Sequence, residues 1–450
     1  MITLCPRPFP VRIALASALL AAGCAISPGS QAPPAPAGFS ADTFTREGLV
    51  SGATATEVGC RALPDALWVE TSGRRECLRY AAGGAAGPSP VALLHLPGDP
   101  PGIGYRVAGG RVQVDRVSEF YEQDAGSRRL AARILAGTMQ NMPVFLIARP
   151  GMHGSSGNHA QDRHTLDEVE LVDGAVGMLK RRYGFRDAVL SGFSSGGLLV
   201  ANLLARRSDI RCAVIASAPL DLAQFHSRPD GIVADDFALR MPDLADPMRS
   251  VATIRSNAEI FVIGDRRDRS VPHAAWIGWS AAARRKGLRV HDAQTNGLDR
   301  AELGPVRTYH ITSGRSLEAA YGCATGWPPE RLRQALLGGE RILRPAGQRL
   351  DGAAIRAAFT GRQLSGVDWN RWGMRATLST FWSTDGKQYQ FHSAHLDRRL
   401  VTQQWWIDSD TLCTSDDGCN AVLFDGQALH LVGDEPRRFQ MSFTADAPGH

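Results

Sequence analysis

The sequence predicts an α/β fold, a mostly parallel sheet flanked by helices, followed by a second, small C-terminal antiparallel β domain. From about residue 91 to residue 324, short apolar runs alternate with longer amphipathic stretches, which is typical of parallel strands joined by helices. After about Trp327 the chain changes to short segments separated by turn pairs such as Asp385-Gly386 and Asp425-Gly426, which is typical of antiparallel strands. A length of 450 residues also favours two domains.

The individual elements of the first domain follow from this alternation. Continuous apolar runs predict buried strands at Val91–Leu96, Pro143–Ala148, Ala188–Ser191, Cys212–Ser217, Ile260–Gly264 and Leu288–His291. Amphipathic stretches predict helices at Val117–Leu135, Leu166–Tyr183, Leu198–Arg207 and Ala274–Lys286. We expect leading antiparallel strands between Phe39 and Ala82, and one helix, Leu350–Phe359, in the second domain.

The first residues have the composition of a secretory signal peptide. Arg7 and Arg12 precede an apolar run from Ile13 to Ala22, which is too short to span a bilayer as a stable helix. A stretch rich in Pro, Ala and Gly follows. We therefore expect a signal peptide at 1–23, a tether at 24–40, the α/β domain at 41–326 and the β-rich domain at 327–450.

The end of the apolar run, Leu20-Ala21-Ala22-Gly23-Cys24, resembles a bacterial lipobox. The resemblance implies cleavage before Cys24, acylation of Cys24, and a lipoprotein anchored in the cell envelope and facing the periplasm. Ala25 follows Cys24, which favours the outer membrane. The alternative is a plain signal peptide and a soluble periplasmic or secreted protein.

Net charge and cysteine usage limit the function classes. The formal charge is +5, and residues 1–23 hold two of the 50 basic residues and no acid, so the mature chain carries +3. The Lys and Arg residues are scattered, which gives no reason to expect nucleic-acid binding. In an oxidising compartment we expect disulfides Cys60–Cys77 and Cys413–Cys419, whereas Cys212 and Cys323 either pair or are buried thiols.

A Gly-x-Ser-x-Gly motif, Gly192-Phe193-Ser194-Ser195-Gly196, follows a predicted strand and opens a predicted helix. A serine on such a tight strand-to-helix turn projects its hydroxyl, and the residues two before and two after it must be small. The turn also directs the Ser195 N–H at a developing oxyanion. Ser194 is therefore the candidate nucleophile.

The segment from Asp187 to Arg207 resembles the α/β-hydrolase superfamily, and its Gly-x-Ser-x-Gly-Gly form is similar to the prolyl-oligopeptidase-like and dienelactone-hydrolase-like branches. The resemblance covers about Val91 to Ala324. It implies a triad in the chain order Ser, acid, His.

Asp268 lies in a loop after a predicted strand that resembles the acid-bearing loop of the family, and the resemblance implies that Asp268 is the triad acid. Asp265 is a near alternative, and Asp221, after the preceding strand, is a more distant one. The base is expected after the last strand, at His310. His291 ranks second, because it lies within the predicted strand.

The family's oxyanion loop corresponds to Leu96-Pro97-Gly98-Asp99. Here Pro97 stands where the family usually has His, and it has no N–H to donate. The resemblance therefore implies the Asp99 N–H as the second oxyanion donor, with Gly98 as the alternative.

These residues predict an exported serine hydrolase that cleaves a carboxylic ester of a small-molecule or peptide acyl substrate without a cofactor. The alternatives are a peptidase or aminoacyl amidase and a non-catalytic envelope-binding protein. We expect His153, His159 and His164 at the pocket rim rather than on a metal. The C-terminal segment resembles a small, uncharacterised β domain of bacterial periplasmic proteins, which implies a fold and no activity.

Overall fold

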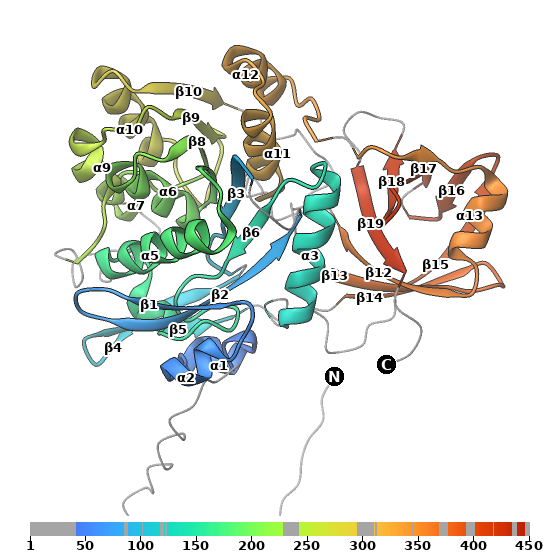
Figure 1. Cartoon of the computed structure of the whole chain (residues 1–450), viewed down its shortest axis with the longest axis horizontal. Helices are drawn as coiled ribbons and strands as arrows, with labels where there is room; N and C mark the ends of the chain where they lie inside the picture. Colours follow the sequence, from blue (N-terminus) through green and yellow to red (C-terminus); the bar gives the residue numbers. More distant parts are fainter. Residues whose placement is uncertain are drawn as a thin grey trace, which may run out of the picture. The chain divides into compact units, whose positions relative to one another are not determined.

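The structure is a computed structural model, shown in Figure 1. It describes residues 42–84, 89–100, 102–117, 121, 124–227, 243–294, 310, 313–343, 345–368, 377–392, 401–416, 418–433 and 439–445. The predicted signal peptide, Cys24 and the tether up to residue 40 lie outside these residues, so lipid anchoring and export stay predictions.

The first part of the chain forms an eight-stranded sheet in the order β1-β2-β6-β3-β7-β8-β9-β10. Only β2 runs against its neighbours, and every pair from β6 to β10 is parallel. The strands are β1 (Ala66–Glu70), β2 (Arg75–Gly83), β3 (Val91–Leu96), β6 (Val144–Ile147), β7 (Asp187–Phe193), β8 (Ile210–Ala216), β9 (Glu259–Gly264) and β10 (Arg289–Gln294). The mostly parallel α/β sheet is confirmed.

Helices cover both faces of this sheet (Figure 1). Successive side chains of a strand point to opposite faces, so Leu94 of β3 packs in one hydrophobic cluster and its neighbour Leu93 in another. The first cluster includes α5 (Leu166–Tyr183), α6 (Ser195–Arg206), α7 (Leu222–His226) and α10 (Ala274–Arg285). The second includes α3 (Ala125–Thr138), α11 (Ser313–Ala324) and α12 (Pro329–Leu337).

The structure corrects one predicted helix and adds a hairpin that was not predicted. Helix α3 begins at Ala125 rather than at Val117, because Asp124 caps it by accepting a hydrogen bond from the Ser127 N–H. Before it lies a hairpin that the apolar pattern did not reveal, formed by β4 (Gly104–Ala108) and β5 (Arg111–Arg116).

The leading strands β1 and β2 follow three short helices, η1 (Asp42–Phe44), α1 (Arg46–Ser51) and α2 (Glu57–Arg61). The remaining short helices are α4 (His159–Asp162), α9 (Pro247–Ser250) and η3 (Val251–Thr253).

The C-terminal strands form a closed antiparallel barrel, drawn in orange and red in Figure 1. Strands β12 to β19 pair in the order β17-β16-β15-β14-β13-β12-β19-β18, and β18 pairs with β17 to close the ring. They are β12 (Arg362–Asp368), β13 (Thr377–Trp382), β14 (Lys387–His392), β15 (Val401–Asp408), β16 (Thr411–Thr414), β17 (Gly418–Phe424), β18 (Leu429–Gly433) and β19 (Phe439–Ala445). Strand β11 (Gln348–Arg349) adds to β17, and α13 (Gly352–Phe359) packs into the barrel core. The small antiparallel β domain is confirmed.

Three disulfides link the described cysteines. Cys60–Cys77 and Cys413–Cys419 pair as predicted, and Cys212 pairs with Cys323 across β8 and α11. Of the two states open for Cys212 and Cys323, the structure has the bonded one. None of the helices in the described ranges is long and apolar enough to cross a membrane.

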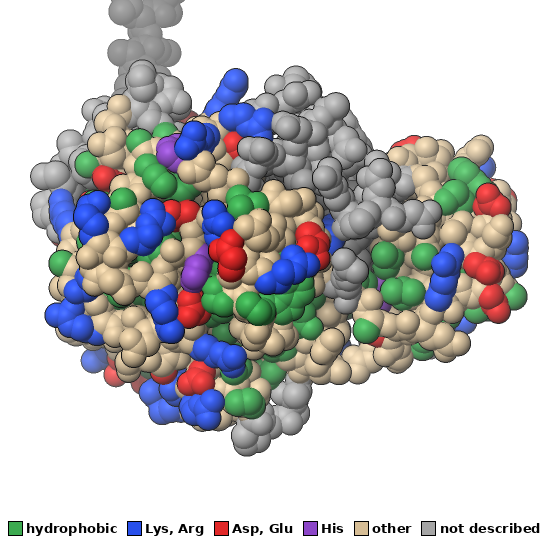
Figure 2. Space-filling view, turned by 90° about the horizontal axis from the view of Figure 1, so that it is seen from above, with side chains coloured by type: hydrophobic (Ala, Val, Ile, Leu, Met, Phe, Trp, Pro, Cys, Tyr) green, Lys and Arg blue, Asp and Glu red, His purple; other side chains and the backbone are tan. Residues whose placement is uncertain are grey.

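Basic side chains do not gather into one patch on the face seen in Figure 2. Lys and Arg lie dispersed there among acidic and hydrophobic side chains. This distribution is the one expected for a solvated surface.

We predict that His95 makes the fold sensitive to acid. His95 is buried in β3, where Nδ1 lies 3.0 Å from Ser191 Oγ. Burial, together with the charge of Arg128, lowers the pKa of His95 to about 3. An unfolded histidine titrates near 6.5, so between about pH 6.5 and 3 only the unfolded chain takes up this proton, and stability falls by about 1.4 kcal/mol per pH unit.

The measurement is the free energy of unfolding from denaturant titrations between about pH 6 and 4. His95→Gln is expected to show a shallower loss of stability with falling pH than the wild type. Identical slopes would contradict the assignment of this proton to His95.

Candidate active site

Ser194 occupies a strained turn between β7 and α6. Its φ of 52° and ψ of −124° lie outside the regions that side-chain-bearing residues normally adopt, which costs on the order of 1–3 kcal/mol. The Ser194 N–H donates to the Ala216 carbonyl at 2.8 Å and so ties the turn to the end of β8. This is the conformation of a nucleophile elbow, which projects the serine hydroxyl above the sheet.

The two glycines of the motif are sterically required. A Cβ added to Gly196 would lie 2.0 Å from the Leu96 carbonyl oxygen. A Cβ added to Gly192 would lie 2.5 Å from the Gly196 oxygen. The elbow therefore packs directly on the backbone at the end of β3, and no side chain fits between them.

Asp268 and His310 meet as a hydrogen-bonded acid–histidine pair. Asp268 follows β9 and is buried, and its Oδ1 accepts hydrogen bonds from the N–H groups of Ser270 at 2.8 Å and Val271 at 3.0 Å. Its Oδ2 lies 2.7 Å from His310 Nδ1. The backbone thus fixes the carboxylate, and the carboxylate fixes the imidazole through Nδ1, so that Nε2 is the ring nitrogen on the side away from Asp268.

The His310 ring lies beside the elbow. Its centroid is 4.8 Å from that of Phe193, the residue directly before Ser194. The structure therefore brings the elbow serine, the histidine and the acid of the sequence analysis into one region at the carboxyl ends of the strands.

The rival residues are engaged elsewhere. Both carboxylate oxygens of Asp265 accept hydrogen bonds from Arg267. His291 lies within β10, where Nε2 is 2.7 Å from a carboxylate oxygen of Glu259 on β9. Asp221 caps helix α7. None of the three is paired with the elbow in the described part of the chain.

The loop after β3 lies against the nucleophile. A Cβ added to Gly98 would come within 2.8 Å of Ser194 Cβ, so this backbone touches the serine. On the other side, Ser195 is the first residue of α6, and the first N–H groups of a helix have no partner within the helix. Ser195 thus adjoins Ser194 in the chain, and the backbone of Gly98, the residue before Asp99, touches Ser194 from the loop after β3.

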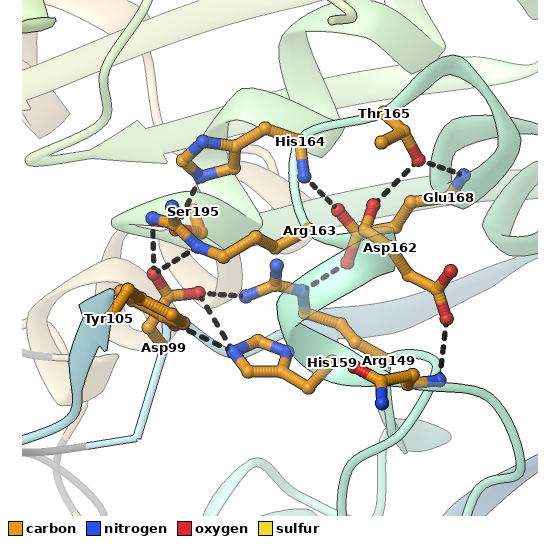
Figure 3. A network of polar contacts seen from close by, with 11 residues as sticks. Asp99, Tyr105, Arg149, His159, Asp162, Arg163, His164, Thr165, Glu168 and Ser195 are labelled. Atoms are coloured by element: carbon orange, nitrogen blue, oxygen red, sulfur yellow. Dashed lines mark hydrogen bonds and ion pairs between the residues drawn. The ribbon is translucent and has the colours of Figure 1, made fainter. Parts of the chain in front are cut away.

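A polar network holds the Asp99 side chain (Figure 3). Arg149 Nη1 donates to Oδ1 at 2.8 Å, and Arg163 donates to Oδ2 through Nη2 at 2.8 Å and Nε at 3.1 Å. Burial alone would raise the pKa of Asp99, but the charges of Arg163 and Arg149 lower it well below its usual value. Asp99 is therefore an ionised anchor for the loop that touches Ser194.

The same network reaches Ser195. His164 Nε2 lies 2.7 Å from Ser195 Oγ, and the His164 N–H donates to Glu168 Oε2 at 2.7 Å. The other oxygen of Glu168 accepts from Arg149 Nε at 2.7 Å. Burial and the charge of Arg163 lower the pKa of His164 well below 6.5, so its ring is neutral. One segment, residues 149–168, thus contacts the side chains of both Asp99 and Ser195 (Figure 3).

The sequence analysis did not identify this network. It expected His153, His159 and His164 at a pocket rim, whereas the structure buries all three. One signal was present in the sequence: Arg149 follows β6 and Asp99 follows β3 closely. Because β3 and β6 are parallel neighbours, residues after their carboxyl ends meet at one edge of the sheet.

A second Ser-His-Asp cluster occurs in the barrel and differs from the elbow in exposure. His430 Nδ1 lies 2.7 Å from Ser442 Oγ, and Nε2 lies 2.8 Å from Asp425 Oδ2. The side chains of Ser442 and His430 are both fully buried, so no substrate can reach this serine. The cluster is a buried polar link between strands.

No protein-family model matches the sequence, and no curated protein matches it. Among solved structures, the chain is similar to the Pyrococcus furiosus esterase at 16% identity, covering 51% of this chain and 82% of that chain with a TM-score of 0.35. It is similar to the Pyrobaculum calidifontis esterase at 15% identity, covering 63% and 91%, with a TM-score of 0.38. It also resembles the Pyrococcus horikoshii acylaminoacyl peptidase at 13% identity, covering 65% of this chain and 44% of that chain, with a TM-score of 0.38.

At these identities the similarity concerns the fold alone. The fold itself follows from the strand order, from the single antiparallel strand β2, and from the elbow between β7 and α6. By these features the described residues between 66 and 324 have the α/β-hydrolase fold.

Proposed function

We propose that this protein is a serine hydrolase that cleaves a carboxylic ester through an acyl-enzyme. The observation that carries the proposal is the 2.7 Å contact between His310 Nδ1 and Asp268 Oδ2 beside the Ser194 elbow. A serine hydroxyl is a weak nucleophile without a base, and the base needs an orienting carboxylate. The chain offers all three groups at one site.

In the first step Ser194 Oγ attacks the ester carbonyl carbon while His310 Nε2 takes the hydroxyl proton. The carbonyl π-electrons move to oxygen, and the resulting oxyanion accepts hydrogen bonds from the Ser195 and Asp99 N–H groups. Asp268 stabilises the imidazolium. The tetrahedral intermediate then collapses, and the alcohol leaves with the proton from His310.

In the second step water replaces the alcohol. His310 takes a proton from the water as its oxygen attacks the acyl carbon, and the same donors hold the second oxyanion. Collapse releases the acid and returns the proton to Ser194. This sequence of steps uses no cofactor.

The kind of bond that is cleaved and the cellular location of the protein are also part of the proposal. An acyl peptide or aminoacyl amide is the alternative substrate, and a non-catalytic envelope-binding protein is the alternative function. We also propose an envelope lipoprotein acylated at Cys24, and the three disulfides are typical of an oxidising compartment.

We predict that Ser194→Ala abolishes both labelling by a fluorophosphonate probe and hydrolysis of p-nitrophenyl acetate. Loss of the nucleophile lowers kcat by a factor on the order of 10⁴–10⁶. The matched control is Ser442→Ala, which removes the serine of the buried second cluster and is expected to keep full labelling. A wild-type protein that the probe does not label would favour the non-catalytic binding protein. If, in a panel of acyl esters and aminoacyl amides, the wild type cleaves only the amides, the protein is an amidase rather than an esterase.

We predict that His310→Ala abolishes ester hydrolysis while His291→Ala retains it. Of these two histidines it is His310 that contacts Asp268, whereas His291 is paired with Glu259 at the edge of the sheet. The measurement is kcat/KM for p-nitrophenyl acetate across neutral pH. The reverse pattern would assign the base to His291.

We predict that Arg163→Met lowers kcat by up to about 10²-fold with a smaller change in KM. Arg163 holds Asp99 through two nitrogens, and a displaced oxyanion donor weakens binding of the transition state more than binding of the substrate.

The control is Arg129→Met. Arg129 is likewise one of two arginines on a buried aspartate, Asp65, which also binds Arg79. Its loss is expected to lower stability and leave kcat unchanged. Equal loss of kcat in both variants, or a change in KM alone for Arg163→Met, would contradict a positioning role.

A further inference from the structure

The interior of the C-terminal barrel is divided into an apolar and a polar part. Strand register places Trp382, Gln388 and Gln403 on the same face of neighbouring strands. Trp382 belongs to the buried core, so this face is the inner one. One part of the interior holds large apolar side chains from the strands and from the helix α13. They are Ile355, Phe359, Leu364, Trp382, Trp405, Leu412, Val422, Leu429, Leu431 and Phe443.

Further along the strands the inward residues become polar. They are Thr380, Gln388, Gln403, Thr414 and Asn420, and each is buried. Gln388 is 0% exposed, Gln403 5% and Asn420 2%. Amide side chains are mostly found at protein surfaces, and burying one without partners is unfavourable.

These amides do not satisfy one another. Gln403 Nε2 donates to Gln388 Oε1. Within the described ranges, Gln388 Nε2, Gln403 Oε1 and Asn420 Oδ1 have no hydrogen-bond partner. Each unpaired buried group is unfavourable, whereas a leucine in its place would leave no hydrogen-bonding atom unpaired. The Gln388–Gln403 pair therefore presents one free donor and one free acceptor to the inside of the barrel.

We propose that the polar part of the barrel interior binds a small, neutral molecule through an amide group. The carbonyl oxygen of the ligand accepts from Gln388 Nε2, and its N–H donates to Gln403 Oε1. Trp405, the next inward residue after Gln403 on β15, offers an apolar ring to the remainder of the ligand. An eight-stranded barrel has room for side chains or for one small ligand.

The ligand is neutral because the buried inward side chains that the structure describes are uncharged. A carboxylate or ammonium group placed among them would lose its hydration without gaining an opposite charge. This site is independent of the proposed hydrolase activity, since it shares no residue with the elbow, Asp268 or His310.

The test is a titration of the full mature chain with acetamide. Binding is measured from the side-chain amide resonances of Gln388 and Gln403 in NMR spectra. We expect saturable shifts at millimolar acetamide, because a ligand of so few atoms binds weakly. Acetate, which has the same size and a negative charge, is expected to leave the resonances in place. Ser194→Ala is expected to bind acetamide like the wild type, which separates this site from the hydrolase site.

The variant Gln388→Leu/Gln403→Leu is expected to lose acetamide binding and to keep its folded tryptophan resonances. Gln404→Leu is the matched control, since Gln404 is exposed on the outer face of β15 and its loss should change nothing. The wild type alone can overturn the proposal. It would do so if the resonance shifts did not saturate with acetamide, or if acetate produced the same shifts. Equal saturable shifts in the double variant would overturn it as well, and the amides would then be satisfied by water alone.

Discussion

The contact between the Ser194 elbow and the end of β3 is the constraint on which the rest of the site depends. Gly196 lies so close to the Leu96 carbonyl that no Cβ fits, and a Cβ on Gly98 would come within 2.8 Å of Ser194 Cβ. The left-handed φ of Ser194 persists because the surrounding strands and helix leave no alternative. Packing of the parallel sheet therefore supplies the energy that holds the serine in a half-buried, strained position.

Ion pairs and hydrogen bonds hold the residues next to the nucleophile in addition to packing. A strained turn positions the nucleophile, and the loop after β3 is held through the side chain of Asp99. Arg149 and Arg163 provide that support through the buried carboxylate of Asp99, and His164 supports Ser195. Ion pairs buried this deeply contribute little net stability. Their effect is positional, because they hold two loops at fixed distances from one serine.

The barrel shows why residue identity does not suffice to recognise a site. Ser442, His430 and Asp425 have the composition of a triad and good hydrogen-bond distances, but they are buried. Gln388 and Gln403, in contrast, belong to no known motif and yet leave hydrogen-bonding atoms unpaired inside the barrel. Both clusters are buried, so the unpaired hydrogen-bonding atoms of Gln388 and Gln403, rather than sequence pattern or exposure, distinguish them.

The sequence by itself determined what depends on near neighbours: the apolar strands, the elbow at Ser194, and the loop that carries Asp268. Each is a short-range pattern whose backbone conformation follows from adjacent residues. Only the tertiary structure decided that His310 rather than His291 meets the acid, and that Asp99 is held by arginines 50 and 64 residues later along the chain. Those pairings depend on the order of strands in the sheet, which joins residues that no local pattern relates.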